Sequence, residues 1–309
     1  MKDFGRPLSM LPSLLTTVCF SLSVIFAARS ARILGPSLAN LSRLLLAAGL
    51  LAIWAHCFGG GLRGGGLRWF VLSGVIGFGL GDMALFGALS RIGPRLSILL
   101  TQCLAAPIGA LAEWLWMGTV LSPAEFGCSA VILGGVAIAL APDHGWEGDR
   151  RTFWVGTFFG GIAATGQALG AVVSRKGNSL AELSGIHLDG GTAAYQRIIG
   201  GVGVTILAYL LFRGLRPKEE ELDRSRWARG IPMVIANACA GPALGVACYQ
   251  WALRTTATGK VLAIVAMSPL VTLLLTWAID GTRPTQRSIY GSLIAVCGVI
   301  GLKYFSFRE

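Results

Sequence analysis

Two acidic residues stand inside apolar stretches of the sequence, where a charge needs a physical reason. Asp82 lies just past the midpoint of the stretch at 69–89, and Glu113 lies in the next one, at 96–117. A carboxylate near the centre of a bilayer costs roughly 2.5 to 3.5 kcal/mol even on a lenient insertion scale, so such groups usually face the interior of a bundle. We expect Asp82 to orient a solute or to exchange a proton, with a hydrogen bond to a neighbouring helix as the plainer alternative.

The residues around Glu113 share one face of a helix. Successive spacings of 4, 3 and 4 residues separate Gln102, Ala106, Gly109 and Glu113. This spacing is that of a single helical face. Because lipid would penalise both polar side chains, we expect Gln102, Gly109 and Glu113 to face a central cavity.

Other polar side chains within apolar stretches are further candidates for binding a solute. Amides and hydroxyls form hydrogen bonds with zwitterions or sugars, although contacts between helices are the plainer explanation for any one of them. Two arginines, about two turns into their helices, either extend to lipid headgroups or bind an anionic group of the substrate. The candidates are Asp82, Gln102, Glu113, Gln167, Asn237, Tyr249, Gln250, Arg43, Arg197, Ser268 and Thr272.

Two prolines lie within apolar stretches of the chain. Pro107 and Pro269 each free a backbone carbonyl, which is tolerated in a membrane where a cavity or other groups satisfy it. We expect both prolines to bend helices that line the cavity.

The composition is typical of a multi-span membrane protein. Of the 309 residues, 54% are hydrophobic and 13% charged, and the mean hydropathy is +0.66. The net charge is +11, but the 26 Lys and Arg residues are scattered through short connections. This pattern favours membrane lipids rather than nucleic acid as a partner. The cysteines form no CxxC pair and the three histidines are scattered, so we expect no disulfide framework, metal or cofactor.

Hydropathy in a window of about 19 residues predicts membrane-spanning helices along the whole chain. Most connections are short, and the glycine-rich one at 59–67 is typical of a flexible linker. Residues 175–191 and 213–229 form the other long connections. The ten predicted spans are 10–28, 37–57, 69–90, 96–117, 124–142, 153–174, 192–213, 230–252, 259–280 and 287–305.

The chain also aligns with itself at a shift of 164 residues (241 minus 77). At this shift Gly77, Gly81, Gly127 and Gly134 fall on Gly241, Gly245, Gly291 and Gly298. Residues 40–43 correspond to 194–197 at a shift of 154 (197 minus 43). We therefore predict two repeats of five helices, residues 1–146 and 147–309. Because five is odd, the second repeat is inverted relative to the first, a common plan of secondary transporters.

Short motifs recur in the two halves. The sequence has SRLL at 42–45 and QRII at 196–199, GD at 81–82, FGALSRIG at 86–93, a proline in each fourth span, and glycines at corresponding places in each fifth span. As an ordered double set, over essentially the whole chain, these features resemble the EamA-type transporters of the drug/metabolite transporter superfamily. The usual Gly-Glu after the fourth helix is absent, because the corresponding residues are Gly118-Thr119 and Asp280-Gly281.

The resemblance implies an all-α integral membrane protein of ten helices around a central cavity. Helices 1 to 4 and 6 to 9 would line the cavity, with helices 5 and 10 at the periphery. It also implies alternating access, commonly for the export of amino acids or other metabolites, and termini on the cytoplasmic side. The distribution of Lys and Arg leans the other way, towards termini outside.

We therefore expect a secondary active transporter that exports a small polar metabolite such as an amino acid, by proton coupling or exchange, and not an enzyme. Its partners would be the small-molecule substrate and lipids of a bacterial cytoplasmic (inner) membrane, with a homodimer left open. The alternatives are a flippase for a lipid or lipid-linked sugar, and an intramembrane enzyme that uses Asp82 and Glu113 as acid and base.

Overall fold

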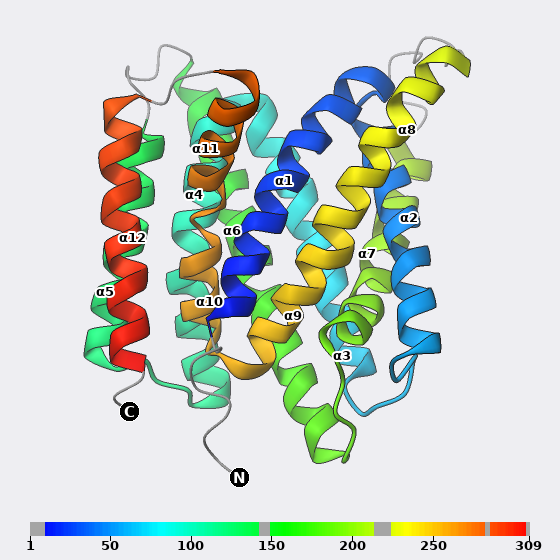
Figure 1. Cartoon of the computed structure of the whole chain (residues 1–309), viewed down its shortest axis with the longest axis horizontal. Coiled ribbons are helices and arrows are strands. Elements are labelled where there is room, and N and C mark those ends of the chain that lie inside the picture. Colours follow the sequence, from blue (N-terminus) through cyan, green and yellow to red (C-terminus); the bar gives the residue numbers. More distant parts are fainter. Residues whose placement is uncertain (1–9, 142–148, 213–223, 282–284, 307–309) are drawn as a thin grey trace.

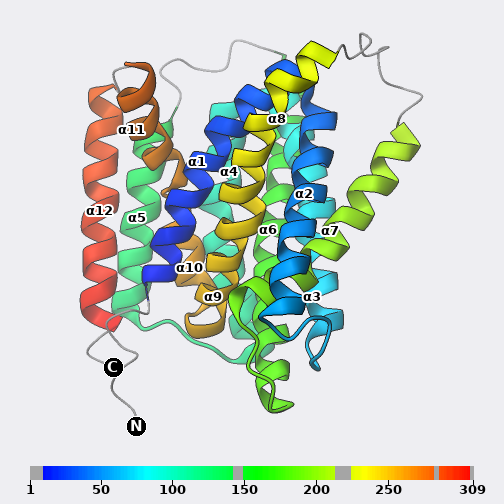
Figure 2. The same ribbon diagram turned by 45° about the vertical axis from the view of Figure 1, so that its right-hand side comes forward.

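Helices form nearly all of the chain in the computed structural model, which describes residues 10–141, 149–212, 224–281 and 285–306. These residues contain no strand (Figures 1 and 2). Ten of the helical segments are long and apolar enough to cross a membrane, as the sequence predicts. The protein is therefore an all-α integral membrane protein.

The helical elements follow the order of the predicted spans. Two of the elements, η1 and η3, are π-helical. In chain order the elements are α1 (Leu11–Leu34), α2 (Pro36–Cys57), α3 (Leu67–Gly74), η1 (Val75–Gly81), α4 (Asp82–Met117), α5 (Pro123–Leu140), α6 (Arg150–Leu183), α7 (Gly190–Phe212), α8 (Arg224–Ala238), η3 (Cys239–Gly245), α9 (Val246–Thr255), α10 (Thr258–Val265), α11 (Ser268–Asp280) and α12 (Gln286–Ser306).

Two spans exceed the predicted lengths most. The sixth span runs from Arg150 to Leu183 and the eighth from Arg224 to Thr255, whereas the predictions were 153–174 and 230–252. Residues 175–183, predicted to be part of a connection, are therefore helical. A hydropathy window finds only the apolar middle of a helix, and the sixth helix continues past it with charged residues.

Helix α4 contains the turn between the third and fourth spans. At Gly93 the backbone has φ 73° and ψ 168°. Residues other than glycine rarely adopt such a φ, so Gly93 lets the chain reverse direction with almost no connecting segment. The third span thus ends at Gly93 and the fourth begins at Leu96.

The third and eighth spans share an unusual π-helical turn. In the third span α3 passes into η1 and then α4, and in the eighth α8 passes into η3 and then α9. Adding 164 to the bounds of η1 gives the bounds of η3 (75 plus 164 is 239, and 81 plus 164 is 245). Wide turns of this kind are frequent at functional sites. Their matching positions support an internal repeat, while the inverted relation of the halves stays a prediction.

The ninth span is broken at Pro269. Helix α10 ends at Val265 and α11 begins at Ser268, with the proline in its first turn. Because Pro269 has no N–H, the Val265 carbonyl loses its usual partner and accepts a hydrogen bond from Ser268 Oγ at 2.6 Å instead. On the neighbouring α1, Ser21 Oγ donates to the Ser268 carbonyl at 2.8 Å. The break is thus satisfied by side chains.

Helices α5 and α12 form a pair at one edge of the bundle (Figure 1). They approach closely where Gly135 faces Gly291, since a Cβ on either glycine would overlap the backbone of the other helix. Small residues allow such approaches between membrane helices. The pair leaves the remaining helices to form the centre of the molecule.

The glycine-rich segment at 59–67 is not a free linker. Gln196 Nε2 on α7 donates to the carbonyls of Gly61 at 3.0 Å and Arg63 at 3.1 Å. Asp189, just before α7, accepts from Trp54 Nε1 on α2 at 2.8 Å. Burial raises the pKa of Asp189, but hydrogen bonds from Thr192 and Trp54 outweigh it and hold the pKa below its ordinary value. Composition indicated flexibility here, yet these contacts fix the segment against α7.

Candidate functional site

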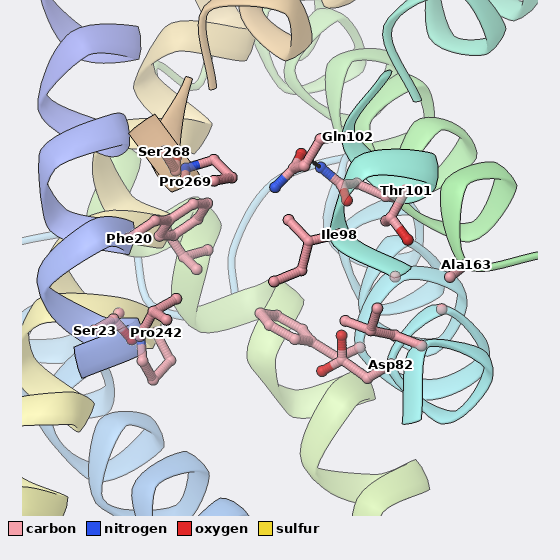
Figure 3. Close-up of a pocket in the computed structure, with 18 of the residues that line it drawn as sticks. Phe20, Ser23, Asp82, Ile98, Thr101, Gln102, Ala163, Pro242, Ser268 and Pro269 are labelled. Atoms are coloured by element: carbon pink, nitrogen blue, oxygen red, sulfur yellow. Dashed lines mark hydrogen bonds between the residues drawn. The ribbon is translucent and has the colours of Figure 1, made fainter. Parts of the chain in front are cut away.

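A cavity of about 470 Å³ lies where the two π-helical turns meet the other central helices. Its walls come from α1, α2, η1, α4, α6, α7, η3, α9 and α11, with Leu140 at the end of α5 as one further contribution. In Figure 3, Phe20, Ser23, Pro242, Ser268 and Pro269 form one wall and Asp82, Ile98, Thr101, Gln102 and Ala163 the other. Each wall therefore contains residues from both halves of the chain.

The structure brings most of the predicted candidates to this cavity. A polar residue in an apolar stretch is the signal that identified them. The candidates that line it are Arg43, Asp82, Gln102, Gln167, Arg197, Tyr249, Ser268 and Thr272, together with Pro269.

Three of the lining residues are charged. Asp82 is the first residue of α4, directly after η1, and its carboxylate points into the space between the two walls (Figure 3). Arg43 and Arg197 reach the same cavity from α2 and α7. Among the described residues, Asp82 forms no hydrogen bond and no ion pair within 4 Å. The two cations and the anion therefore share one space without direct pairing.

At the end of the cavity away from Asp82, two amide side chains form a hydrogen-bonded pair. Gln167 Nε2 on α6 donates to Gln102 Oε1 on α4 at 3.2 Å (Figure 3). This bond leaves the Gln102 amide N–H₂ and the Gln167 carbonyl oxygen without a hydrogen-bond partner among the described residues. One donor and one acceptor thus remain for a solute.

Apolar and aromatic residues form the rest of the lining. Phe20 and Tyr249 pack with ring centroids 6.2 Å apart, and Phe78 lies on η1. We did not predict Phe20, Phe78 or Pro242 from the sequence, because an apolar residue in an apolar stretch carries no signal. Ser23 and Thr101, which also line the cavity, carried the same signal as Ser268 and could have been found.

Glu113 does not line this cavity, and neither does Gly109. Glu113 is 1% exposed. It forms an ion pair with Arg175 on α6 and accepts a hydrogen bond from the backbone N–H of Thr258 at 2.5 Å, at the start of α10. Gly109 packs against Leu262. The expected common face with Gln102 is thus divided: Gln102 reaches the cavity, and Glu113 binds neighbouring helices.

Arg175 links two further elements to this ion pair. Its Nη1 donates to the carbonyls of Leu253 at 2.9 Å and Thr256 at 2.5 Å, near the end of α9. The sequence offered no signal for this role, since Arg175 was assigned to a connection.

Two other candidates also serve contacts between helices. Asn237 Oδ1 accepts from Ser23 Oγ at 2.7 Å, and Gln250 Nε2 donates to Ser174 Oγ at 3.0 Å. Neither residue lines the cavity. Pro107 is outside it as well, and α4 continues through this position as helix. In the structure, Asn237 and Gln250 therefore form contacts between helices, which was the plainer explanation for such residues.

The described residues contain no group of His, Cys, Asp or Glu that could hold a metal ion. What the cavity offers instead is charge and hydrogen bonding within apolar walls. Such a site can bind and orient a small polar solute.

Comparison with known proteins gives two findings. Residues 154–304 match the EamA-like transporter family. A solved structure titled only "Crystal structure of protein" is similar in fold, with a TM-score of 0.75 and 18% sequence identity over 98% of this chain and 99% of that chain. No curated protein matches the chain.

Proposed function

The chain belongs to the EamA-like transporters of the drug/metabolite transporter superfamily, and on this premise we propose that it is a secondary transporter of a small polar metabolite, such as an amino acid. It works by alternating access and exports its solute across the cytoplasmic (inner) membrane of a bacterium. The observation that carries the proposal is the cavity in which Asp82, Arg43 and Arg197 meet between the two halves of the chain.

The position of the cavity suits this mechanism. Transporters built from repeats commonly bind their solute at the interface of the repeats, where helices are discontinuous. Here the interface contains η1, η3 and the break before Pro269. These are the places where backbone geometry departs from a regular α-helix. Solute binding there can bias the packing of one half against the other.

The energy source follows from the sequence and from Asp82. The chain has no phosphate-binding loop of the kind that ends in Gly-Lys-Ser/Thr. Transport then depends on an ion gradient or on exchange of one solute for another. Asp82, free of direct partners and open to the cavity, is the group that would exchange a proton.

An intramembrane enzyme with Asp82 and Glu113 as acid and base has less support. General acid and base groups must both reach the reacting atoms. Asp82 faces the cavity, while Glu113 is held by Arg175 and Thr258 outside it. The two carboxyl groups therefore serve different places in the fold.

A flux assay tests the proposal. The purified protein is reconstituted in liposomes, and a panel of amino acids and other small metabolites is followed with and without an imposed pH gradient. We expect at least one solute to cross faster than in protein-free liposomes, and the pH gradient to change its rate. If every solute on the panel crosses at the protein-free rate, the proposal is wrong for that chemistry.

A further inference from the structure

Arg197 is a buried cation whose hydrogen bonds are not satisfied. It is 6% exposed, and it lines the central cavity. Its Nε and Nη1 atoms have no hydrogen-bond partner of good geometry among the described residues. Burying a guanidinium without an acceptor is strongly unfavourable, so its presence needs an explanation.

The surrounding elements fix the guanidinium in place. It lies over the ring of Phe78 at 5.2 Å and the ring of Tyr249 at 5.4 Å. Glycines let α7 come close to α3 and η1, since a Cβ on Gly74 would overlap the Arg197 carbonyl and one on Gly77 would lie 2.7 Å from Nη2. These cation–π contacts hold the guanidinium in place, and its Nε and Nη1 remain without an acceptor of good geometry among the described residues.

The corresponding arginine of the first half is different. Arg43 Nε donates to Asn40 Oδ1, one helical turn earlier, at 2.8 Å. At the shift of 154 (197 minus 43), the residue that corresponds to Asn40 is Ala194, which has no acceptor. Arg43 thus has an acceptor on its own helix, whereas Arg197 has none on its helix. The Tyr249 hydroxyl on α9 is close enough to interact with the Arg197 guanidinium, but Nε and Nη1 still have no acceptor of good geometry among the described residues.

The charge of the cavity indicates the sign and size of the missing group. Two arginines and one aspartate line it, a sum of +1 when all three are charged. A single carboxylate neutralises this sum and matches the fork of a guanidinium through two hydrogen bonds. The apolar lining around Phe20, Ile98 and Val246 suits an apolar body behind such a headgroup.

We propose that Arg197 binds a carboxylate group of the solute, and that the solute is an organic carboxylate with an apolar body. This inference rests on the proposed transport function, because it names the chemistry of the solute that the cavity carries. Arg197 is then a specificity-determining residue, held by Phe78 and Tyr249 for this contact.

Binding of a simple probe tests the inference directly. Benzoate is the probe, and benzamide is its uncharged counterpart of nearly the same shape. We expect benzoate, and not benzamide, to raise the midpoint of thermal unfolding of the detergent-solubilised protein. Arg197→Met should weaken the affinity for benzoate by about tenfold or more, because a charge-assisted pair is lost, and Arg197→Lys should restore part of it.

A matched control is Arg91→Gln. Arg91 also lies over a phenylalanine ring, that of Phe159, at 4.9 Å, but it is exposed and outside the cavity. This variant should bind benzoate as the parent does. Equal loss in both variants, or no difference between benzoate and benzamide in the parent, overturns the inference.

The stability of the protein without solute gives a second readout. If the solute supplies the acceptor for Arg197, then Arg197→Met removes an unpaired buried charge from the solute-free protein. The unfolding midpoint should then stay the same or rise. If Arg197 serves only the packing of Phe78 and Tyr249, the midpoint falls, and the inference is overturned.

The transport assay separates this inference from the proposed function. Binding of benzoate that depends on Arg197, without transport of any carboxylate, leaves the carboxylate site standing and overturns transport. Transport of neutral or cationic solutes at equal rates in the parent and Arg197→Met leaves transport standing and overturns the carboxylate site.

Discussion

Asp82 is the only acid among the described residues that line the central cavity. Its position is set by η1, which ends one residue before it. The charged and titratable groups that line the cavity with it are Arg43, Arg197 and Tyr249, from three other helices. None of them forms an ion pair or hydrogen bond with its carboxylate. We therefore expect the charge on Asp82 to respond to what enters the cavity.

We predict that Asp82→Asn uncouples transport from a pH gradient. The substitution keeps the size of the side chain and removes its ability to bind and release a proton. Uphill accumulation driven by a pH gradient should be lost, while exchange of labelled for unlabelled solute should persist. Both are measured in liposomes at equal protein content.

Glu182→Gln is the control for this change. Glu182 is an exposed acid at the end of α6 that pairs with Arg254 at 3.5 Å, outside the cavity. Its replacement should leave both rates at the parental level. If the Asp82→Asn protein still accumulates solute at the parental rate, Asp82 has a structural role and the proton route is wrong.

For single residues, the sequence identified polar side chains that line the cavity, but it did not predict how far along each helix the cavity extends. Arg43, Asp82 and Gln102 were found because a polar group in an apolar stretch is unusual. Glu113 was misplaced because helical spacing reports the face of a helix and not how far along it a cavity extends. Glu113 lies eleven positions after Gln102, a rise of about 16 Å along the helix, which carries Glu113 past the cavity to the start of α10.

Ion pairs join the elements at the end of the bundle that contains the turn from α9 to α10 (Figure 1). Glu113 on α4 pairs with Arg175 on α6, and Lys260 Nζ on α10 lies 2.6 Å from Glu125 Oε1 on α5. Arg175 also holds the last carbonyls of α9. The proposed alternating access would require these buried contacts to separate or to move together.

We predict that Arg175→Met strongly destabilises the protein. It leaves the Glu113 carboxylate buried without its cation, a change that typically costs 3 to 5 kcal/mol, roughly, in free energy of unfolding. Adding Glu113→Gln should recover a large part of this loss, because the uncompensated charge is removed while Thr258 keeps an acceptor. The midpoint of thermal unfolding in detergent is the measurement.

Arg254→Met provides the comparison for a partly exposed pair. Its partner Glu182 is 46% exposed, so the loss should be about 1 kcal/mol or less. Strictly additive effects of Arg175→Met and Glu113→Gln would show that the two residues are not coupled, contrary to this interpretation.

The sequence predicted the membrane-spanning helices better than the irregular turns within them. Hydropathy found each span, and Pro269 marked the break in the ninth. Pro107 did not interrupt α4, although the same argument was applied to it. The π-helical turns had no sign in composition, because an extra residue in a turn leaves the apolar pattern nearly unchanged. Their glycines at matching positions were the one trace, and it indicated a repeat rather than a change of geometry.

For the whole molecule, hydropathy predicted the number of spans, and the family resemblance implied the central cavity. The close pairing of α5 with α12 at the edge (Figure 1) agrees with the peripheral role that the family resemblance implied. Which helices meet around the cavity could not be derived from hydropathy, since that depends on packing between residues far apart in the chain.

We predict that residues 1–146 and 147–309 superpose as inverted repeats in an experimental structure. Gly77 should fall on Gly241 and Gly134 on Gly298, with η1 on η3. The reason is that the two π-helical turns are related by the same shift of 164 residues (239 minus 75) as these glycines. Parallel halves, or these glycines on helices that do not correspond, would contradict the prediction.

Arg43 and Arg197 differ in their hydrogen bonds, and this difference has a consequence for the orientation of a bound solute. In an antiparallel pair of identical halves, an elongated solute along the axis would bind equally well head first or tail first. Asn40 occupies Arg43 and Ala194 leaves Arg197 open, so this degeneracy is broken. If Arg197 binds the carboxylate as proposed, that group would have a single position between the two leaflets, and the rest of the solute would point away from it in one sense only. With the halves arranged as predicted, the difference between Asn40 and Ala194 would add to the polarity across the membrane that Asp82 also gives, since the residue at the shift of 164 is Val246 (82 plus 164).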